Sequence, residues 1–394
     1  MKKFLLVSAS LLVLATAAKA EDVKIGIEMG FTGPIETLTP PMAQAAELVI
    51  KEVNDSGLFL DGAKVTAVRA DETCIDAGAA TAAAERLITG DKVAGIIGPS
   101  CSGAATAVLT NVAVPNGIVL ISPSATSPAL STLEDKGLFF RTAPSDAREG
   151  EVLAQIMRDR GIKSVAISYT NNDYGKGVAS SVQTAFEKLG GKVTLSAPHE
   201  DGKGDYSAEV GSLASAGGDA LVIAGYADQG GAGIVQTVLD TGAFSKFAFP
   251  NGMWGASLVK RFGTQLDGAF GNLPGTDSPG AAKLMEMTEK AGIAGSATFV
   301  PETYDATALM LLAMQAAKSS ASADYKSKIM DVANAPGEKI YPGELAKALQ
   351  ILKDGGDIDY VGASAVELIE PGESAGAFRE QEIEGGAVKT VKFH

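Results

Sequence analysis

The sequence predicts an α/β protein of two lobes, each built on a parallel sheet with helices on its faces. From residue 23 to residue 250, short apolar strands alternate with amphipathic helices, a pattern typical of parallel sheets. One series of alternating strands and helices ends near Pro144, and a second series begins after it. Because 394 residues also suffice for two domains of ordinary size, we interpret the two series as two lobes.

The first series opens with an apolar strand at 23–29. The next segment has apolar residues at helical spacing before the stop signal at 54–57. Those residues are Met42, Ala45, Ala46, Val49 and Val53. The remaining expected elements are a strand at 65–69, a helix at 77–89, and strands at 93–97, 118–122 and 138–141.

The second series repeats this order after Pro144, and Gly161 and Gly190 end its first two helices. Its helices are expected at 149–160, 176–189, 207–216 and 234–240. Its strands are expected at 164–169, 193–197, 220–226 and 247–250.

The last third of the chain has helices with only weak strands between them, so these helices should pack onto a sheet already built. They are expected at 280–291, 303–317 and 343–352, and short strands at 365–369, 378–383 and 388–393. We infer that the chain crosses between the lobes more than once. The expected division is a first lobe of residues 21–143 and 275–361 and a second lobe of residues 144–274 and 362–394.

Residues 1–20 are typical of a secretory signal peptide. Lys2 and Lys3 precede an apolar run at 4–18, and Ala18-Lys19-Ala20 is a small-residue cleavage site. The alternative is a membrane anchor, but the run is shorter than the roughly 20 residues that a spanning helix needs. We therefore expect an exported, periplasmic protein cleaved after Ala20.

The chain is acidic, with 33 Lys and Arg against 47 Asp and Glu and a net charge of -14. Loss of the three lysines in residues 1–20 makes the exported chain more acidic still. Such a surface repels nucleic acid and anionic lipid and suits a soluble monomer.

The two cysteines, Cys74 and Cys101, are natural partners in an oxidising compartment, where disulfides form and persist. The alternative is two separate buried thiols. A bridge of this span would stabilise the chain by about 3 kcal/mol. We interpret it as a local clamp on the turn before Ser102.

The segment 96–106 has the pattern of an anion site: an apolar strand, a Gly-Pro turn, Ser102 and the start of a small-residue helix. Unpaired N–H groups and a partial positive charge at a helix N-terminus favour a small carboxylate. Ligands of open α/β sheets bind at the carboxyl ends of the strands, and this segment follows a strand.

Other strand ends carry further candidates. The loop at 121–128 offers hydroxyl groups, although an ordinary Ser/Thr/Pro turn has the same composition. Tyr174 and Tyr226 follow two strands of one lobe, where aromatic faces can close over a ligand or simply pack. Trp254 follows the last strand of the series and is either a core or a ligand-contacting residue.

Signals of an enzyme are weak. His199 and His394 share no metal-ligand spacing with Cys or acidic residues, and the common hydrolase, metalloprotease and P-loop motifs are absent from the sequence. The glycines at 231–233 lack the third glycine of a dinucleotide-binding loop. Tyr304-Asp305 is explained by an acidic residue near a helix N-terminus. We expect no catalytic residue, cofactor or metal.

Taken together, the sequence resembles the branched-chain amino-acid-binding family of periplasmic substrate-binding proteins. The segments that carry the resemblance are 24–26, 32–34, 98–102 with the two cysteines, 121–128, 172–175 and 225–226. The resemblance implies the type I periplasmic fold, with two Rossmann-like lobes joined by a multi-strand hinge. It also implies a solute-binding component of an ABC importer that delivers its ligand to a permease, and a Cys74–Cys101 disulfide.

The resemblance also implies a ligand site. It places the ligand carboxylate on Ser102 and on the loop formed by Ser124, Ala125 and Thr126, with Thr126 also near the amine. Tyr174 and Tyr226 would come from the second lobe as it closes.

One position departs from the family. The family usually offers an acidic side chain to the ligand amine where this chain has Asn251, and Asp228 or Glu36 could replace that charge. Leu38 stands where relatives that favour branched ligands tend to have a bulky aromatic residue. The ligand could be a branched-chain or other amino acid, a 4-aminobutyrate-like acid or an aromatic carboxylate, its identity depending on these residues and Trp254.

Two other functions are compatible with the sequence. A ligand-sensing periplasmic receptor would keep the same site and change only the partner. A secreted two-lobe oxidoreductase would instead use the Gly-rich loop at 230–233.

Overall fold

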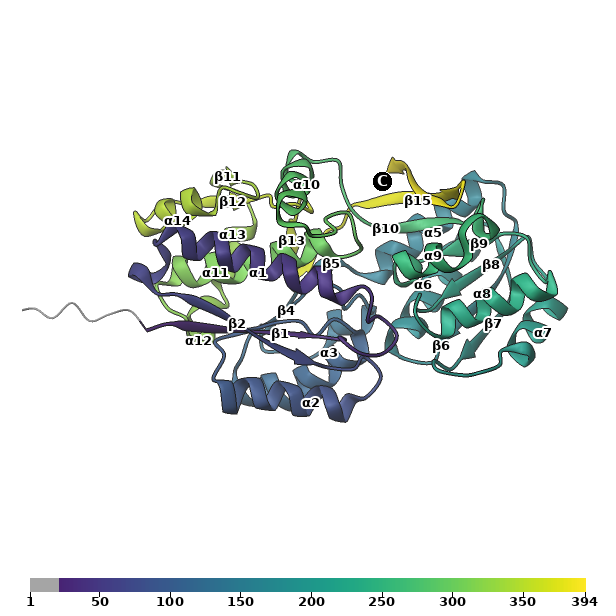
Figure 1. Cartoon of the computed structure of the whole chain (residues 1–394), viewed down its shortest axis with the longest axis horizontal. Coiled ribbons are helices and arrows are strands. Elements are labelled where there is room, and N and C mark those ends of the chain that lie inside the picture. Colours follow the sequence, from purple (N-terminus) through teal and green to yellow (C-terminus); the bar gives the residue numbers. More distant parts are fainter. Residues whose placement is uncertain (1–20) are drawn as a thin grey trace, which may run out of the picture.

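The computed structural model describes residues 21–394 and consists of two α/β lobes side by side (Figure 1). The first lobe has a seven-stranded sheet of order β13-β14-β5-β4-β3-β1-β2, and the second has one of order β16-β15-β10-β9-β8-β6-β7. The predicted fold class is confirmed. The expected signal peptide lies outside the described residues. Within residues 21–394, no helix combines the length and apolar character needed to cross a bilayer.

The first sheet is built from the first β–α series. Its parallel strands are β1 (Val23–Met29), β2 (Val65–Asp71), β3 (Ile96–Ile97), β4 (Leu120–Ser122) and β5 (Phe139–Pro144). Helices α1 (Thr39–Ser56), α2 (Ala77–Glu85), α3 (Ser102–Val108) and α4 (Val114–Asn116) belong to this series, and short helical turns lie at Phe59–Gly62, Arg86–Asp91, Leu109–Ala113 and Pro128–Thr132. The strands β1 and β4 and the helix α1 therefore form where the alternation predicts them.

The second sheet follows the restart after Pro144. Its elements are α5 (Asp146–Asp159), β6 (Ser164–Thr170), α6 (Asp173–Lys188), β7 (Lys192–His199), α7 (Ser207–Ala216), β8 (Ala220–Ala224), α8 (Gly230–Thr241), β9 (Phe247–Phe249), α9 (Ala256–Phe262) and β10 (Phe270–Pro274), with short turns at Asn251–Met253 and Gly263–Leu266. The sequence did not predict α9 or β10. In β10, Gly271, Asn272 and Pro274 interrupt the apolar run that signals a buried strand.

The later helices return to the first lobe, as expected. They are α10 (Pro279–Ala291), α11 (Val300–Ala317), α12 (Ser322–Tyr325), α13 (Lys328–Ala333) and α14 (Leu345–Lys353), with a two-stranded sheet of β11 (Glu338–Ile340) and β12 (Ile358–Tyr360). Helix α11 is buried over nearly its whole length and packs against α1. A helix that is buried on nearly every side lies at the centre of a lobe, and its few polar side chains must find partners inside the protein.

The C-terminal strands divide between the two sheets. Strands β13 (Leu368–Ile369) and β14 (Glu373–Ser374) join the first sheet, whereas β15 (Phe378–Glu384) and β16 (Ala387–Phe393) join the second. The chain therefore crosses after β5, after β10 and after β14, in agreement with several crossings. The expectation that all of 362–394 belongs to the second lobe is wrong for 368–374, because β14 pairs with β5. The other boundaries of the expected division stay predictions.

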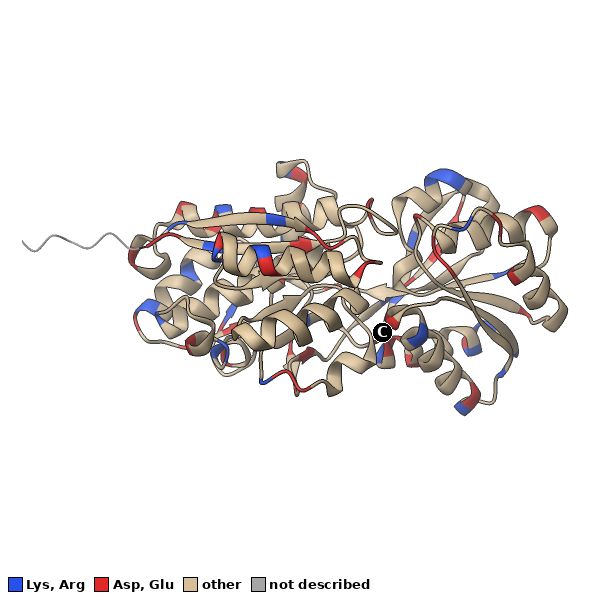
Figure 2. Ribbon diagram, turned by 90° about the horizontal axis from the view of Figure 1, so that it is seen from below, with Lys and Arg blue, Asp and Glu red and all other residues tan. Residues whose placement is uncertain are grey.

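Charged residues of both signs are interspersed over the two lobes (Figure 2). Most ion pairs of the described chain lie at the surface, where each contributes little to stability.

One buried ion pair is different. Arg141 on β5 is 1% exposed and forms an ion pair with Glu373 on β14. The same guanidinium donates to the carbonyls of Ala125 at 3.2 Å and Ser127 at 2.9 Å and to the hydroxyl of Ser131 at 2.7 Å. Arg141 thus ties the loop after β4 to the crossing after β14.

The substitution Arg141→Met should lower the free energy of unfolding by about 3 to 5 kcal/mol, because it leaves Glu373 without its buried partner. Urea-induced unfolding followed by circular dichroism measures this loss. Arg148→Met removes an exposed arginine paired with Glu151 and should cost less than about 1 kcal/mol. Equal losses in the two variants would contradict the role assigned to Arg141.

Candidate functional site

A cavity lies between the lobes at the carboxyl ends of their strands. Its lining residues are Ile35, Leu38, Met42, Ser100, Cys101, Ser102, Ser124, Tyr174, Tyr226, Asn251, Gly252 and Phe299. Both lobes contribute to the wall, and apolar side chains of the first lobe form much of it. Six of the residues singled out from the sequence are brought together here: Leu38, Ser102, Ser124, Tyr174, Tyr226 and Asn251.

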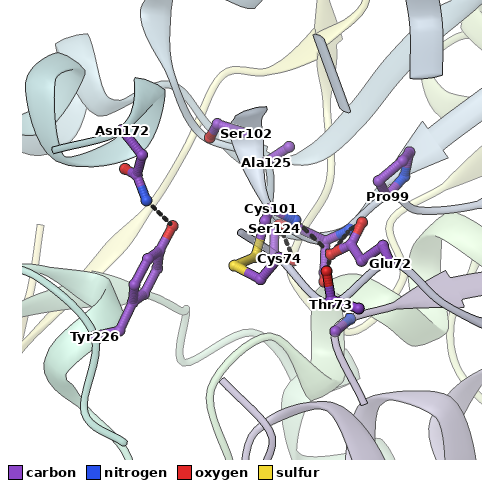
Figure 3. Close-up of a disulfide and its surroundings, with 12 residues drawn as sticks. Glu72, Thr73, Cys74, Pro99, Cys101, Ser102, Ser124, Ala125, Asn172 and Tyr226 are labelled. Atoms are coloured by element: carbon purple, nitrogen blue, oxygen red, sulfur yellow. Dashed lines mark hydrogen bonds between the residues drawn. A yellow bond between two sulfur atoms is a disulfide. The ribbon is translucent and has the colours of Figure 1, made fainter. Parts of the chain in front are cut away.

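The first wall contains the disulfide. Cys74 and Cys101 are bonded, with Cα atoms 5.3 Å apart, so the alternative of two free thiols is wrong. Figure 3 shows the bridge beside Ser124 and Glu72, with Tyr226 and Asn172 across the cleft. The disulfide joins the loop after β2 to the turn that precedes α3, and it fixes that turn beside the cavity.

The turn before α3 already binds a carboxylate of the chain itself. The side chain of Glu72 is fully buried and accepts hydrogen bonds from the N–H groups of Ser100 at 3.1 Å and Cys101 at 2.9 Å and from the Ser100 hydroxyl. Burial raises the pKa of Glu72 to about 8, although these hydrogen bonds oppose the shift. Sequence reasoning missed Glu72; its place directly after β2, two residues before Cys74, is the signal that could have found it.

Because Glu72 occupies two N–H groups of the turn, the donors left for a ligand lie further along. They are the first N–H groups of α3 and the Ser102 hydroxyl. The Ser102 Oγ accepts from the N–H of Ser127 at 3.2 Å, which leaves its O–H free to donate. The Ser124 hydroxyl instead donates to the carbonyl of Ser100 at 3.0 Å. Ser102 is therefore the better-placed donor for an anionic group.

The opposite wall is aromatic. The rings of Tyr174 and Tyr226 stack with centroids 5.0 Å apart and an interplanar angle of 22°. The Tyr174 hydroxyl accepts from the N–H of Gly252 at 2.9 Å, and the Asn172 amide donates to the Tyr226 hydroxyl at 3.4 Å. Burial raises the pKa of both phenols, so both rings are neutral. Two anchored rings offer a fixed face to a ligand.

Three polar side chains meet behind this wall. Asp146 and Glu149, in the first turn of α5, are fully buried and lie against Asn251. The N–H of Asn251 donates to Glu149 at 2.7 Å, and its side-chain amide donates to Glu149 and, at 3.3 Å, to Asp146. Burial raises the pKa of both carboxyl groups. Sequence analysis missed this pair, because acidic residues at a helix start are usually explained by the helix dipole.

Comparisons with known proteins identify the family of this chain. The model of the periplasmic binding protein family matches residues 22–337. The Leu/Ile/Val-binding protein homolog 1 of Brucella suis biovar 1 is 30% identical over 324 residues, which cover 81% of this chain and 83% of that protein. The chain belongs to the periplasmic binding protein family. This confirms the resemblance seen in the sequence motifs.

Solved structures share the fold of this binding protein. The leucine binding protein LivK of Thermotoga maritima has a TM-score of 0.78 at 21% identity, covering 94% of this chain and 98% of that one. A solute binding protein of an ABC transporter from R. palustris, solved with benzoate, has a TM-score of 0.75 at 17% identity, covering 94% and 96%. Relatives with this fold therefore include both leucine- and benzoate-binding proteins, so the fold by itself does not select a ligand.

Five candidate ligand residues from the sequence do not line the cavity of the binding protein: Ala125, Thr126, Trp254, Asp228 and Glu36. Ala125 and Thr126 lie behind Ser124, and the carbonyl of Thr126 accepts from the N–H of Asp146 at 2.9 Å. Trp254 packs edge-on against Phe249 and donates its indole N–H to the Phe249 carbonyl at 3.0 Å. Of its two interpretations, the position of Trp254 favours the core.

Asp228 lies at the rim, where the lobes of the binding protein meet. Its carboxylate accepts from the Thr37 N–H at 3.0 Å, from the Thr37 hydroxyl at 2.8 Å and from the Ser257 hydroxyl at 2.5 Å. A second contact joins the lobes where Thr298 donates to the carbonyl of Trp254 at 2.7 Å. Asp228 thus connects the two lobes and does not face the cavity, and Glu36 is exposed.

The two histidines of the binding protein do not line the cavity. His199 is buried, shares a hydrogen bond of 2.8 Å with Ser168, and has a pKa lowered by burial to about 4. His394 lies 3.2 Å from Glu380 at the C-terminus. Within residues 21–394, no cluster of three His, Cys, Asp or Glu side chains has the arrangement of a metal site.

The raised pKa of Glu72 predicts a pH dependence of stability. The folded protein holds the Glu72 proton to about pH 8, whereas the unfolded chain loses it near its ordinary value of 4.5. Between these values the folded state binds more protons, so this group makes stability fall as pH rises, by up to about 1.4 kcal/mol per pH unit. Glu72→Gln should lack this contribution and become more stable relative to the parent protein from pH 4.5 to 8.

Urea unfolding of both proteins across this range measures the difference. A difference that stays constant with pH would contradict the buried, protonated Glu72.

Proposed function

We propose that this protein binds an amino acid or a related small carboxylate between its lobes and delivers it to the permease of an ABC importer. The observation that carries the proposal is the interlobe cavity, with the free Ser102 hydroxyl on one wall and the stacked Tyr174 and Tyr226 on the other. A carboxylate fits the first wall, because the donors there are a hydroxyl and the N-terminus of α3. The apolar side chains of Ile35, Leu38 and Phe299 suit the rest of a small ligand.

The ligand docks first on the lobe that carries Ser102, and the second lobe then closes over it. No bond is made or broken, so the protein needs closure energy and no catalytic group. The contacts of Thr37 with Asp228 and of Thr298 with Trp254 connect the lobes in the closed state. The closed shape is what a permease would recognise.

The proposal includes the cellular setting. Residues 1–20 act as a signal peptide cleaved after Ala20, and the exported protein acts in the periplasm as a monomer. Names of relatives support this setting, since they include Leu/Ile/Val-binding homologues and a solute binding protein of an ABC transporter.

The substitution Ser102→Ala should raise the dissociation constant for the bound carboxylate about tenfold to a hundredfold, because it removes a hydrogen bond to a charged group. A thermal-shift screen of amino acids, 4-aminobutyrate and benzoates identifies a ligand, and isothermal titration calorimetry then measures its affinity. Ser212→Ala, on the exposed face of α7, is the matched control. An unchanged dissociation constant in Ser102→Ala would overturn the role of Ser102.

The substitution Asp228→Asn should speed dissociation of the ligand about threefold to tenfold, because it weakens hydrogen bonds that form when the lobes meet. Association should change little, since docking on the open lobe does not use Asp228. Stopped-flow tryptophan fluorescence follows both rates. If Thr37 and Asp228 act in one contact, ligand dissociation from the variant Thr37→Val/Asp228→Asn should be no faster than from either single variant. Additive effects on the dissociation rate would contradict a shared contact.

A further inference from the structure

A pair of opposite charges lies among the crossings between the lobes, away from the cavity lining and the rim contacts. Glu302 lies in the first turn of α11, on the first lobe, and its side chain is 1% exposed. Arg379 is the second residue of β15, on the second lobe, and pairs in register with Leu273 of β10. Each of the two charges shifts the pKa of the other, so they face each other across the hinge.

Both residues are held against the segments about which the lobes rotate. The carbonyl of Glu302 accepts from the Thr142 hydroxyl at 2.7 Å, and Thr142 lies two residues before β5 ends. The stem of Arg379 packs on Gly275 in the crossing after β10, where an added Cβ would lie 2.9 Å from the Arg379 Cδ. A rotation about the crossings therefore moves Arg379 relative to Glu302.

The pair is unsatisfied in this structure, in which rim contacts join the lobes. The Oε1 of Glu302 and the Nε of Arg379 are buried and have no hydrogen-bond partner within residues 21–394. The guanidinium instead donates from Nη2 to the carbonyl of Ser296 at 3.0 Å. Burial raises the pKa of Glu302 to about 7, and its own backbone N–H and the charge of Arg379 oppose part of this rise. Two buried polar atoms without partners destabilise this conformation, and direct contact between them would remove both costs.

The segment 296–302 of the first lobe connects Arg379 to the rim and to the cavity. The Thr298 hydroxyl donates to the Trp254 carbonyl of the second lobe at 2.7 Å, and Phe299 lines the cavity. The Ser296 carbonyl and the Glu302 carboxyl lie at the two ends of this segment. One short segment therefore carries a contact of the closed lobes and two alternative acceptors for Arg379.

We propose that Arg379 is a hinge switch that changes its acceptor when the lobes move. With the lobes closed, as in this structure, it donates to the Ser296 carbonyl. With the lobes apart, it forms an ion pair with Glu302. The ion pair stabilises the open state, so contacts with a ligand must offset its loss on closure. The inference rests on the lobe closure of the proposed function and adds a determinant of closure outside the cavity.

The substitution Glu302→Gln removes the charge that Arg379 meets in the open state. It should raise the closed-to-open ratio of the ligand-free protein about threefold to tenfold, because a charged hydrogen bond is stronger than a neutral one. Small-angle X-ray scattering of the ligand-free protein measures this ratio through the radius of gyration. Glu286→Gln is the matched control, since it removes the same charge from the exposed face of α10 and should leave the ratio unchanged.

A closed-to-open ratio that stays constant or falls in Glu302→Gln would overturn the switch, and so would an equal rise in Glu286→Gln. Leucine and benzoate, whichever of them binds, should have a dissociation constant lowered by the same factor in Glu302→Gln, since Glu302 does not line the cavity. Failure of leucine, benzoate and every other amino acid and carboxylate to bind would overturn the proposed function. The ratio in the ligand-free protein would still test the switch.

A measurement on the native protein covers the case in which Glu302→Gln does not fold. In protein labelled with ¹⁵N-arginine, the side-chain Nε–H of Arg379 is assigned by through-bond correlation to its backbone. An Nε–H that donates to a carboxylate gives a downfield proton signal, whereas an unpartnered Nε–H does not. We expect the downfield signal for Arg379 in the ligand-free protein, and its absence would overturn the switch.

Discussion

The hydrogen bonds of Arg141 hold the binding cleft together. Its guanidinium binds the carbonyls of Ala125 and Ser127, and the N–H of Ser127 in turn donates to Ser102. A single buried cation thus fixes the backbone that orients the hydroxyl proposed to meet the ligand. The same cation pairs with Glu373, so the loop after β4 and the last crossing between the lobes are fixed together. A shift of either segment would therefore move the Ser102 hydroxyl.

Arg141 also explains how the cleft tolerates buried acids on two sides. Its charge lowers the pKa of Asp146 and opposes part of the rise caused by burial. Glu72 instead has three hydrogen-bond donors and a high pKa, so it can be neutral where a ligand carboxylate would approach. Burial thus raises the pKa of carboxyl groups on both sides of the cavity, and the charge of Arg141 opposes the rise at Asp146.

Much of the fold could be predicted from the sequence, because parallel β–α units leave a local signature. Strand β1 has the predicted bounds, and helix α7 does as well. Strand β10 was missed, because its Gly, Asn and Pro residues conceal a strand that only pairing with β9 and β15 makes visible. The last crossing was misplaced for a similar reason, since β14 is only two residues long and is defined by its pairing with β5.

The candidate site likewise contains residues that the sequence could predict and residues that it could not. Ser102, Tyr174 and Tyr226 follow strands, and strand ends are where such sheets bind ligands, so their sequence positions were informative. The roles of Glu72, Asp146 and Glu149 depend on contacts between segments far apart in the sequence. Asn251 illustrates the limit: its neutral side chain signalled a missing charge, but the sequence pointed to Asp228 or Glu36. The structure instead places Asp146 and Glu149 against it.

The contacts that join the lobes at the rim are few and partly exposed, in contrast to the enclosed groups below them. Hydrogen bonds such as that of Thr37 with Asp228 exchange with water when the lobes separate, so each contributes only about 1 kcal/mol. Closure restricts the movement of the lobes, which costs entropy. Contacts of this strength therefore make the closed state only slightly more stable than the open state. A ligand can then shift the balance, but only by the difference between its affinities for the two states. In the proposed mechanism that difference comes from groups that reach the ligand only on closure, and the candidates are the cavity-lining residues Tyr174, Tyr226 and Asn251 of the second lobe. Selectivity and closure are therefore properties of the same wall, and a ligand that fails to contact it would bind the first lobe without closing the cleft.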